Sequence, residues 1–222
     1  MLATVEDPSR FGVVVHEQET GKVQRFVEKP KQFVGNHINA GIYVLNTSIL
    51  DRIPERFCMI ETEIYPKLAE EGQLYSLPIK DNFWYDIGKP ADYIKAQGAY
   101  LKYYNIHTNP DQKNGNVFVH ESSIVGSDCK LGPNVAIGPG CKIGNGVRLA
   151  NCSIIADTNV GDYSYISDTI ISWGCAIGKN VRIEGLTAIA EDCEVRDDVR
   201  VTECMICSHK NISTNVQKEI LM

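Results

Sequence analysis

Apolar residues in the second half of the chain, from about residue 117 to about residue 212, recur every six positions. At three places the spacing is five residues in place of six, and the repeat of six then continues. The apolar positions, here called rungs, are Val119, Val125, Leu131, Ile137, Ile143, Leu149 and Ile155; Ile154, Val160 and Ile166; Ile171, Ile177, Ile183, Ile189, Val195 and Val201; and Ile206 and Ile212. A period of six fits neither an α-helix, which repeats every 3.6 residues, nor a long strand, which repeats every two. It predicts short parallel strands joined by tight turns, as in a parallel β-helix, and the turn signals of an antiparallel sandwich are missing.

Most cysteines of the chain lie at one position of this repeat, two residues before a rung. They are Cys129, Cys141, Cys152, Cys175, Cys193 and Cys204. A cysteine at such a position can act as a small buried apolar side chain, so we expect reduced, structural thiols. Cys204 and Cys207 lie close together, but no second cysteine pair and no paired histidines accompany them, which argues against a zinc site.

The first half of the chain alternates strand-like and helix-like segments, which predicts an α/β layer. Residues 13–15 and 23–27 are expected to form a hairpin, and residues 38–45 a further strand. Apolar residues spaced by four at Ile60, Ile64 and Leu68 indicate a helix that Pro66 interrupts or divides. A second helix is expected after Pro90, which suits a first helical position. We therefore predict an α/β domain over residues 1–105, a polar linker over 106–116 and a β-helix over 117–222.

Charge and composition narrow the classes of function. The 222 residues are 43% hydrophobic and 23% charged with a net charge of −6, as in an ordinary globular protein. The longest basic clusters are pairs, which argues against a nucleic-acid surface. No apolar run is long enough to span a membrane, and no signal-peptide pattern opens the chain, so a cytoplasmic location is the default expectation.

Three short stretches place polar residues where ligands bind in α/β proteins, at strand ends. They are residues 26–30 (Phe-Val-Glu-Lys-Pro), 39–43 (Asn-Ala-Gly-Ile-Tyr) and 84–90 (Trp-Tyr-Asp-Ile-Gly-Lys-Pro). Each also has a structural reading, since a Glu-Lys pair can be an exposed ion pair and an aspartate can simply organise a turn. The glycine-rich run over residues 138–146 superficially looks like a phosphate-binding loop, but the six-residue repeat accounts for its glycines and no helix follows it.

Together with the β-helix, these stretches resemble the sugar-1-phosphate nucleotidyltransferases, and among them the mannose-1-phosphate guanylyltransferases of the eukaryotic catalytic, or beta, type. The resembling segments are VEDPSRFGVVV, RFVEKP, NHINAGIYVLN, WYDIGKPADYI and the end ISTNV…ILM. The resemblance implies a partial Rossmann-like nucleotidyltransferase domain and a left-handed β-helix. Three hexads would close one triangular coil, which gives roughly five coils about 4.8 Å apart. The implied reaction forms GDP-mannose and pyrophosphate from GTP and mannose-1-phosphate.

The resemblance also implies roles for individual residues. Glu28 would hydrogen-bond sugar hydroxyls, and Lys29 would contact the sugar phosphate. Asn39 and the backbone at Gly12 and Gly41 would line the sugar pocket. These residues would form the substrate-binding site, with Lys29 also contributing to catalysis.

Asp86 would bind one Mg²⁺ and would be the second catalytic residue. Members of the family also carry a glycine-rich G-x-G-T-R-L loop, a downstream lysine and a second metal-binding aspartate, none of which this sequence contains. The expectation is therefore a member without its N-terminal nucleotide-binding half, inactive by itself because most of the GTP site is missing. We expect the β-helix to supply contacts in a homo-oligomer, or in a hetero-oligomer with a regulatory homologue.

Two other classes of protein are alternatives. One is a non-catalytic relative, such as a regulatory alpha-type subunit or an exchange subunit of a translation factor; the presence of Glu28, Lys29, Asn39 and Asp86 argues for the enzyme instead. The other is a hexapeptide acyltransferase, which would carry a catalytic histidine within the coils. His120 and His209 lie at the two ends of the repeat, which argues against that reaction.

Overall fold

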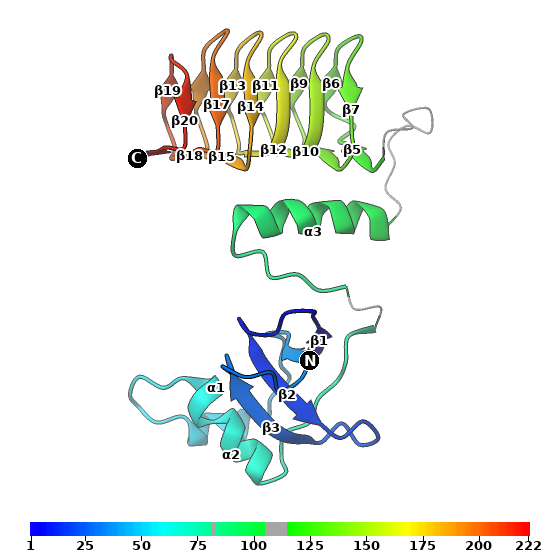
Figure 1. Cartoon of the computed structure of the whole chain (residues 1–222), viewed down its shortest axis with the longest axis vertical. Helices are drawn as coiled ribbons and strands as arrows, with labels where there is room; N and C mark the ends of the chain where they lie inside the picture. The colour runs from blue at the N-terminus through cyan, green and yellow to red at the C-terminus, as the bar shows by residue number, and fades with distance from the viewer. Residues whose placement is uncertain (81–82, 105–114) are drawn as a thin grey trace. The chain divides into compact units, whose positions relative to one another are not determined.

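A computed structural model describes residues 1–80, 83–104 and 115–222. The chain forms two compact units, Met1–Trp84 and Tyr85–Met222 (Figure 1). Each unit has its own hydrophobic core.

The first unit is built on a four-stranded antiparallel sheet. Its strands are β1 (Leu2–Thr4), β2 (Gly12–His16), β3 (Val23–Glu28) and β4 (His37–Asn39), in the order β1-β4-β2-β3. The predicted hairpin is confirmed, because Val14 of β2 lies opposite Phe26 of β3. The two faces of the sheet bury different clusters because successive side chains of a strand point to opposite faces.

Helices cover one face of this sheet. They are the 3-10 helix η1 (Thr47–Arg52), α1 (Ile60–Glu63) and α2 (Tyr65–Glu70). Val14 and Phe26 pack with Tyr65 and Leu68 on this face, while Val13 belongs to the cluster on the other face. The helix predicted around Ile60, Ile64 and Leu68 is divided into α1 and α2, which was one of the two expected effects of Pro66. Pro66 lies in the first turn of α2, where a proline is tolerated. The α/β layer expected from the sequence is thus confirmed.

The strand predicted over residues 38–45 is wrong in its length. β4 ends at Asn39, and Gly41 has a positive φ of 74°, which turns the chain out of the sheet. Beyond it, residues 42–45 pair with no strand of the described residues, and Val44 is fully exposed. A run of strand-forming residues becomes a strand only where another strand satisfies its N–H and C=O groups.

The second unit contains the predicted β-helix, whose short strands run parallel in every pairing. The strands are β5 (Val117–Val119), β6 (Ile124–Val125), β7 (Lys130–Leu131), β8 (Val135–Ile137), β9 (Lys142–Ile143), β10 (Arg148–Ile154), β11 (Asn159–Val160), β12 (Tyr165–Ile171), β13 (Ala176–Ile177), β14 (Arg182–Glu184), β15 (Thr187–Ile189), β16 (Glu194–Val195), β17 (Arg200–Thr202), β18 (Met205–Ile206), β19 (Asn211–Ile212), β20 (Val216–Gln217) and β21 (Ile220–Leu221). One face is the six-stranded sheet β19-β16-β13-β11-β9-β6, to which each coil gives one strand. Residues 115–222 therefore form about six coils, one more than the roughly five expected.

The slips in the six-residue repeat are shortened corners between two faces of the β-helix. Leu149 and Ile154 are both buried rungs, although only five residues separate them, and Ile155, assigned to the repeat from the sequence, is not a core residue. The long strand β10 turns this corner through Asn151, which has a φ of 45°, and β12 does the same through Asp168 with a φ of 50°. A coil with one short corner takes 17 residues in place of 18, so Ile143 pairs in register with Val160.

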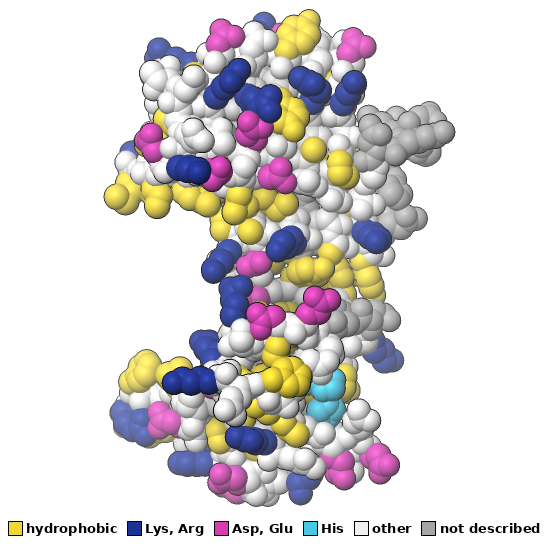
Figure 2. Space-filling model, in the orientation of Figure 1, with side chains coloured by type: hydrophobic (Ala, Val, Ile, Leu, Met, Phe, Trp, Pro, Cys, Tyr) yellow, Lys and Arg dark blue, Asp and Glu magenta, His cyan; other side chains and the backbone are white. Residues whose placement is uncertain are grey.

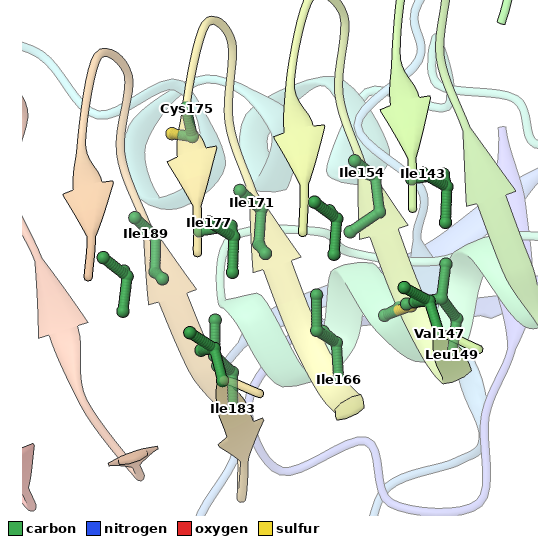
Figure 3. Packing of buried hydrophobic residues seen from close by; sticks show 14 of the residues in the cluster. Ile143, Val147, Leu149, Ile154, Ile166, Ile171, Cys175, Ile177, Ile183 and Ile189 are labelled. Carbon is green, nitrogen blue, oxygen red and sulfur yellow. The ribbon is translucent and has the colours of Figure 1, made fainter. Parts of the chain in front are cut away.

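The rungs form one continuous core along the inside of the coils (Figure 3). Ile166, Ile171 and Ile183 are completely buried, and their side chains lie beside those of the coils before and after. Each fully buried residue of this size contributes about 1.5–3 kcal/mol relative to an exposed one. The repeat stabilises itself because every coil supplies the apolar neighbours of the next.

The cysteines confirm the expectation of reduced thiols and also donate hydrogen bonds. All eight are free, and five are buried. The thiol of Cys175 lies 3.1 Å from the carbonyl oxygen of Ala190 in the next coil, and the hydroxyl of Thr158, at the same position one coil earlier, donates to Ser172 at 2.7 Å. Burial raises the pKa of Cys175 to about 11, which keeps its thiol protonated. The described residues contain no cluster of three or more side chains suited to hold a metal ion.

Helix α3 (Pro90–Tyr103) belongs to the unit that contains the β-helix. The side-chain amide of Gln97 donates to the carbonyl oxygens of Asn134 and Cys152, at 3.1 and 2.9 Å.

The division of the chain into compact units, between Trp84 and Tyr85, differs from the division predicted at residue 105. Of the predicted linker over 106–116, residues 106–114 lie outside the described residues. Among the described residues, no helix has the length and apolar character needed to cross a bilayer.

We predict that Gly161→Ala lowers the free energy of unfolding of the β-helix by about 1–3 kcal/mol, the usual cost of overpacking. A Cβ atom at Gly161 would lie 2.6 Å from the backbone of Gly178 in the next coil, which cannot move without breaking coil stacking. Urea unfolding followed by circular dichroism measures the loss. Gly35→Ala is the control, since the nearest atom to its Cβ, in Val13, is 3.8 Å away. Equal losses in the two variants would contradict the prediction.

We predict that the first unit loses stability as the pH falls below about 6.5. Burial, and after it the charge of His16, hold the pKa of His37 below its ordinary value of 6.5; the two rings are 5.0 Å apart. Below that pH the unfolded chain binds more protons than the folded one, so folding is disfavoured, and above it the effect vanishes. Urea midpoints measured on both sides of pH 6.5 should differ in the wild type. The difference should shrink in His37→Gln and persist in the control His209→Gln.

Candidate functional site

Three of the predicted site residues lie in a row across the end of the first unit's sheet. Glu28 ends β3 and pairs with Gly12, which begins β2. On the other side of β2, Val13 pairs with Ile38 of β4. The next residue, Asn39, ends β4 and therefore lies beside Gly12. Paired residues of antiparallel strands point to the same face, so Glu28 and Asn39 flank Gly12 on the face that the helices cover.

Gly12 is the residue that allows this close approach. A Cβ atom there would lie 2.8 Å from Oε2 of Glu28 and 3.0 Å from the ring of Phe26. The carboxylate of Glu28 therefore lies over bare backbone, and its side chain is 21% exposed. Oε1 of Glu28 is 3.3 Å from Nζ of Lys29, whose side chain is 64% exposed. Lys29 follows the strand with a positive φ of 43°, and its N–H donates to the carbonyl of Phe11 at 3.1 Å.

Asn39 is held at both ends of its amide group. Its Oδ1 accepts a hydrogen bond of 3.2 Å from the N–H of Gly41, and its Nδ2 donates to the hydroxyl of Tyr43. This turn is what makes Gly41 necessary, because its φ is positive, while space for a side chain is open there. The sequence reasoning missed Tyr43 as an orienting residue, although it lies within the stretch over 39–43.

Trp84 is a second residue whose part in the site was not foreseen. Its indole N–H donates to the carbonyl oxygen of Ala40 at 3.0 Å, directly between Asn39 and Gly41. Its ring meets that of Phe11 edge to face at 5.5 Å, next to Gly12. Trp84 therefore ties together the two backbone segments that carry the row. The available signal was an aromatic residue in the stretch that also carries Asp86.

Asp86 belongs to the second unit. It is exposed, and its Oδ1 accepts a hydrogen bond of 3.1 Å from the N–H of Gly88, as in a turn that precedes a helix. Its other carboxylate oxygen accepts no hydrogen bond within the described residues. A hard cation such as Mg²⁺ is commonly held by one or two carboxylates together with substrate phosphates, so one accessible oxygen fits a single such ligand.

The glycine-rich run over residues 138–146 is explained by coil stacking. A Cβ atom at Gly144 would lie 2.7 Å from the backbone nitrogen of Asp162, and one at Gly138 would lie 3.0 Å from that of Ala156. The glycines therefore serve the close contact between coils, as the sequence predicted, and not a phosphate. His120 and His209 contact Ser122 and Asp192 respectively, at opposite ends of the β-helix.

Two family models match the chain, one to each half. Residues 1–103 match the family described as "Nucleotidyl transferase". Residues 113–221 match the family described as "GMPPB C-terminal domain". The first match includes the row of Glu28, Gly12 and Asn39, and the second covers the β-helix.

Curated relatives match the chain over its whole length. It is 43% identical to "Probable mannose-1-phosphate guanylyltransferase 2" of Oryza sativa subsp. japonica and 42% identical to "Mannose-1-phosphate guanylyltransferase 1" of Arabidopsis thaliana, over 100% of this chain and 63% of each relative. It is 40% identical to "Mannose-1-phosphate guanylyltransferase catalytic subunit beta" of Xenopus tropicalis, over 97% of this chain and 61% of that protein. The chain thus spans 63% of the length of the first relatives it matches. Along nearly all of its sequence, the chain is therefore similar to proteins named mannose-1-phosphate guanylyltransferase.

Proposed function

We propose that this chain contributes the sugar-phosphate site and the β-helix of an enzyme that forms GDP-mannose and pyrophosphate from GTP and mannose-1-phosphate. The observation that carries the proposal is the row of Glu28, Gly12 and Asn39 at one end of three adjoining strands. The names of relatives at 40–43% identity support the same substrates. Because the chain spans only 63% of the first relatives it matches, we propose the complete reaction only for this chain together with the part of those relatives that it does not match.

The row suits a phosphorylated sugar. A carboxylate accepts hydrogen bonds from adjacent hydroxyl groups, and the carboxylate of Glu28 occupies the space that a side chain at Gly12 would take. Lys29, directly beside it, provides the cation that a phosphate needs, and its side chain is exposed enough to reach one. Asn39, fixed by Gly41 and Tyr43, offers a defined orientation for a further polar contact.

The reaction proposed for the whole protein is an in-line displacement. An oxygen of mannose-1-phosphate attacks the α-phosphorus of GTP, the bond from that phosphorus to the β-phosphate oxygen breaks, and pyrophosphate leaves. Nucleotidyltransferases generally use a divalent metal ion, which neutralises phosphate charge in such reactions. We assign Mg²⁺ as that ion and Asp86 as a residue that would hold it, while Lys29 holds the sugar phosphate near its attack position.

We predict that mannose-1-phosphate binds the 222-residue chain and that Glu28→Gln weakens this binding about tenfold or more. Hydrogen bonds to a charged group are worth about 1.5–3 kcal/mol, and about 1.4 kcal/mol corresponds to a factor of ten. Isothermal titration calorimetry of the two proteins measures the difference.

Glu19→Gln is the matched control for that experiment. It makes the same chemical change in the turn at the opposite end of β3, where Glu19 is exposed, so it should leave the affinity within about twofold of wild type. If wild type binds no mannose-1-phosphate, or if both variants weaken binding equally, the row is not the sugar-phosphate site.

We predict that Asp86→Asn removes most of the metal-dependent turnover of a chimera in which this chain is joined to the part of the rice relative that it does not match. The substitution keeps the shape of the side chain but removes the charge that a hard cation requires. Pyrophosphate release from GTP and mannose-1-phosphate, titrated with Mg²⁺, is the measurement. The 222-residue chain alone should show no turnover. Asp92→Asn in the same chimera is the matched control, because Asp92 lies in the first turn of α3. Turnover within about twofold of the parent chimera would leave Asp86 as a turn residue only.

A further inference from the structure

Cationic side chains form a row across one face of the β-helix. Lys130 pairs with Arg148, Arg148 with Tyr165, Tyr165 with Arg182, and Arg182 with Arg200, each on the strand of the next coil. We call Lys130, Arg148, Tyr165, Arg182 and Arg200 the basic ladder. Every member points outward because the residue that follows it is a buried rung, and the four cations are exposed. Dark blue Lys and Arg side chains gather over the β-helix in Figure 2.

The aromatic ring in the middle of the ladder holds its neighbours in place. The guanidinium groups of Arg148 and Arg182 lie 5.6 and 4.9 Å from the centroid of the Tyr165 ring, one from the coil on each side. Such cation–π contacts restrict a long flexible side chain without neutralising its charge. The ladder therefore presents cations that are already partly ordered, which lowers the entropic cost of binding an anion.

One member of the ladder already binds a carboxylate of the chain itself. Glu184 lies two residues after Arg182 on the same strand and face, and the guanidinium grips both of its oxygens, with N–O distances of 2.9 and 2.8 Å. Hydrogen bonds from Arg182, and to a smaller extent the charge of Arg200, lower the pKa of Glu184. The remaining cations, Lys130, Arg148 and Arg200, have no ion-pair partner within the described residues.

We infer that the basic ladder is a docking surface for an acidic, extended segment of a partner protein, with carboxylates bound by Lys130, Arg148 and Arg200. The ladder is about 19 Å long, since four steps of about 4.8 Å separate its ends. An extended peptide of seven residues spans about 20 Å between its end residues and, with acidic residues at alternate positions, presents four carboxylates on one side.

The surroundings of the ladder favour a narrow partner with carboxylates over a nucleic acid. Asp128 and Asp198 lie at the corner of the coils, two residues before Lys130 and Arg200. They place negative charge beside two members of the ladder, and the chain as a whole carries a net charge of −6. Duplex DNA carries one negative charge per about 1.7 Å, more than a peptide with acidic residues at alternate positions, so these carboxylates repel DNA more strongly than such a peptide.

The test uses the 222-residue chain and a fluorescein-labelled peptide of sequence Glu-Thr-Glu-Thr-Glu-Thr-Glu, followed by anisotropy. We expect saturable binding at low ionic strength that weakens as salt screens the charges. The triple variant Lys130→Gln, Arg148→Gln, Arg200→Gln should weaken binding about tenfold or more. The matched triple variant Lys142→Gln, Arg196→Gln, Lys210→Gln makes the same change of charge at outward positions elsewhere on the β-helix and should stay within about twofold. Circular dichroism melting curves establish that both variants are folded.

Three outcomes would overturn the inference. One is the absence of saturable peptide binding to the wild type, and another is an equal loss in both triple variants. The third is tighter binding of oligothymidylate, or of vesicles containing phosphatidylserine, that disappears in the ladder variant, since the surface would then serve a nucleic acid or a membrane. Tight peptide binding, with weak oligothymidylate and vesicle binding in the same buffer, supports an acidic protein segment.

Discussion

The hydrogen bonds between successive coils of the β-helix fix how closely the backbone must stack, and most other features of residues 115–222 follow from that spacing. Where one coil passes directly over the next, as at Gly144 and Gly161, no side chain fits. Where side chains point inward they must be apolar and of similar size, as the rungs are, because each touches its counterparts in neighbouring coils. Small donors such as Thr158 and Cys175 complete the corners by binding carbonyl oxygens of the next coil.

This constraint explains why so much of the β-helix could be predicted from sequence. A rule that acts identically on every coil leaves the same residue types at the same position many times, so a single sequence contains the repetition needed to recognise it. What could not be predicted lies where the rule is broken. The short corners at Asn151 and Asp168 change the number of residues in a coil by only one. The hydrogen bonds that the cysteine thiols donate could not be predicted either, because a small apolar side chain would suit the same positions in the sequence.

The first unit behaves differently because its elements do not repeat. The hairpin of β2 and β3 depends on local pattern and was predictable, whereas the end of β4 depends on which strands are available to pair with residues 42–45. The candidate site shows the same division. Resemblance to a family identified Glu28, Lys29 and Asn39, but only the strand register places Glu28 and Asn39 on either side of Gly12. Contacts between residues far apart in the sequence, such as the hydrogen bond from Trp84 to Ala40, cannot be predicted from the pattern of neighbouring residues.

The register of the coils also limits how this protein can change in length during evolution. A single inserted or deleted residue within a strand would move the following rung out of line with its neighbours, which exposes an apolar side chain and buries a polar one, whereas a corner such as that at Asn151 absorbs a change of one residue. Gain or loss of a whole coil, 17 or 18 residues, keeps the alignment of Ile143 with Val160 and of every equivalent pair. The outer faces of the β-helix are therefore free to lengthen or shorten in complete steps. Each such step would add or remove one residue of the row formed by Lys130, Arg148, Tyr165, Arg182 and Arg200.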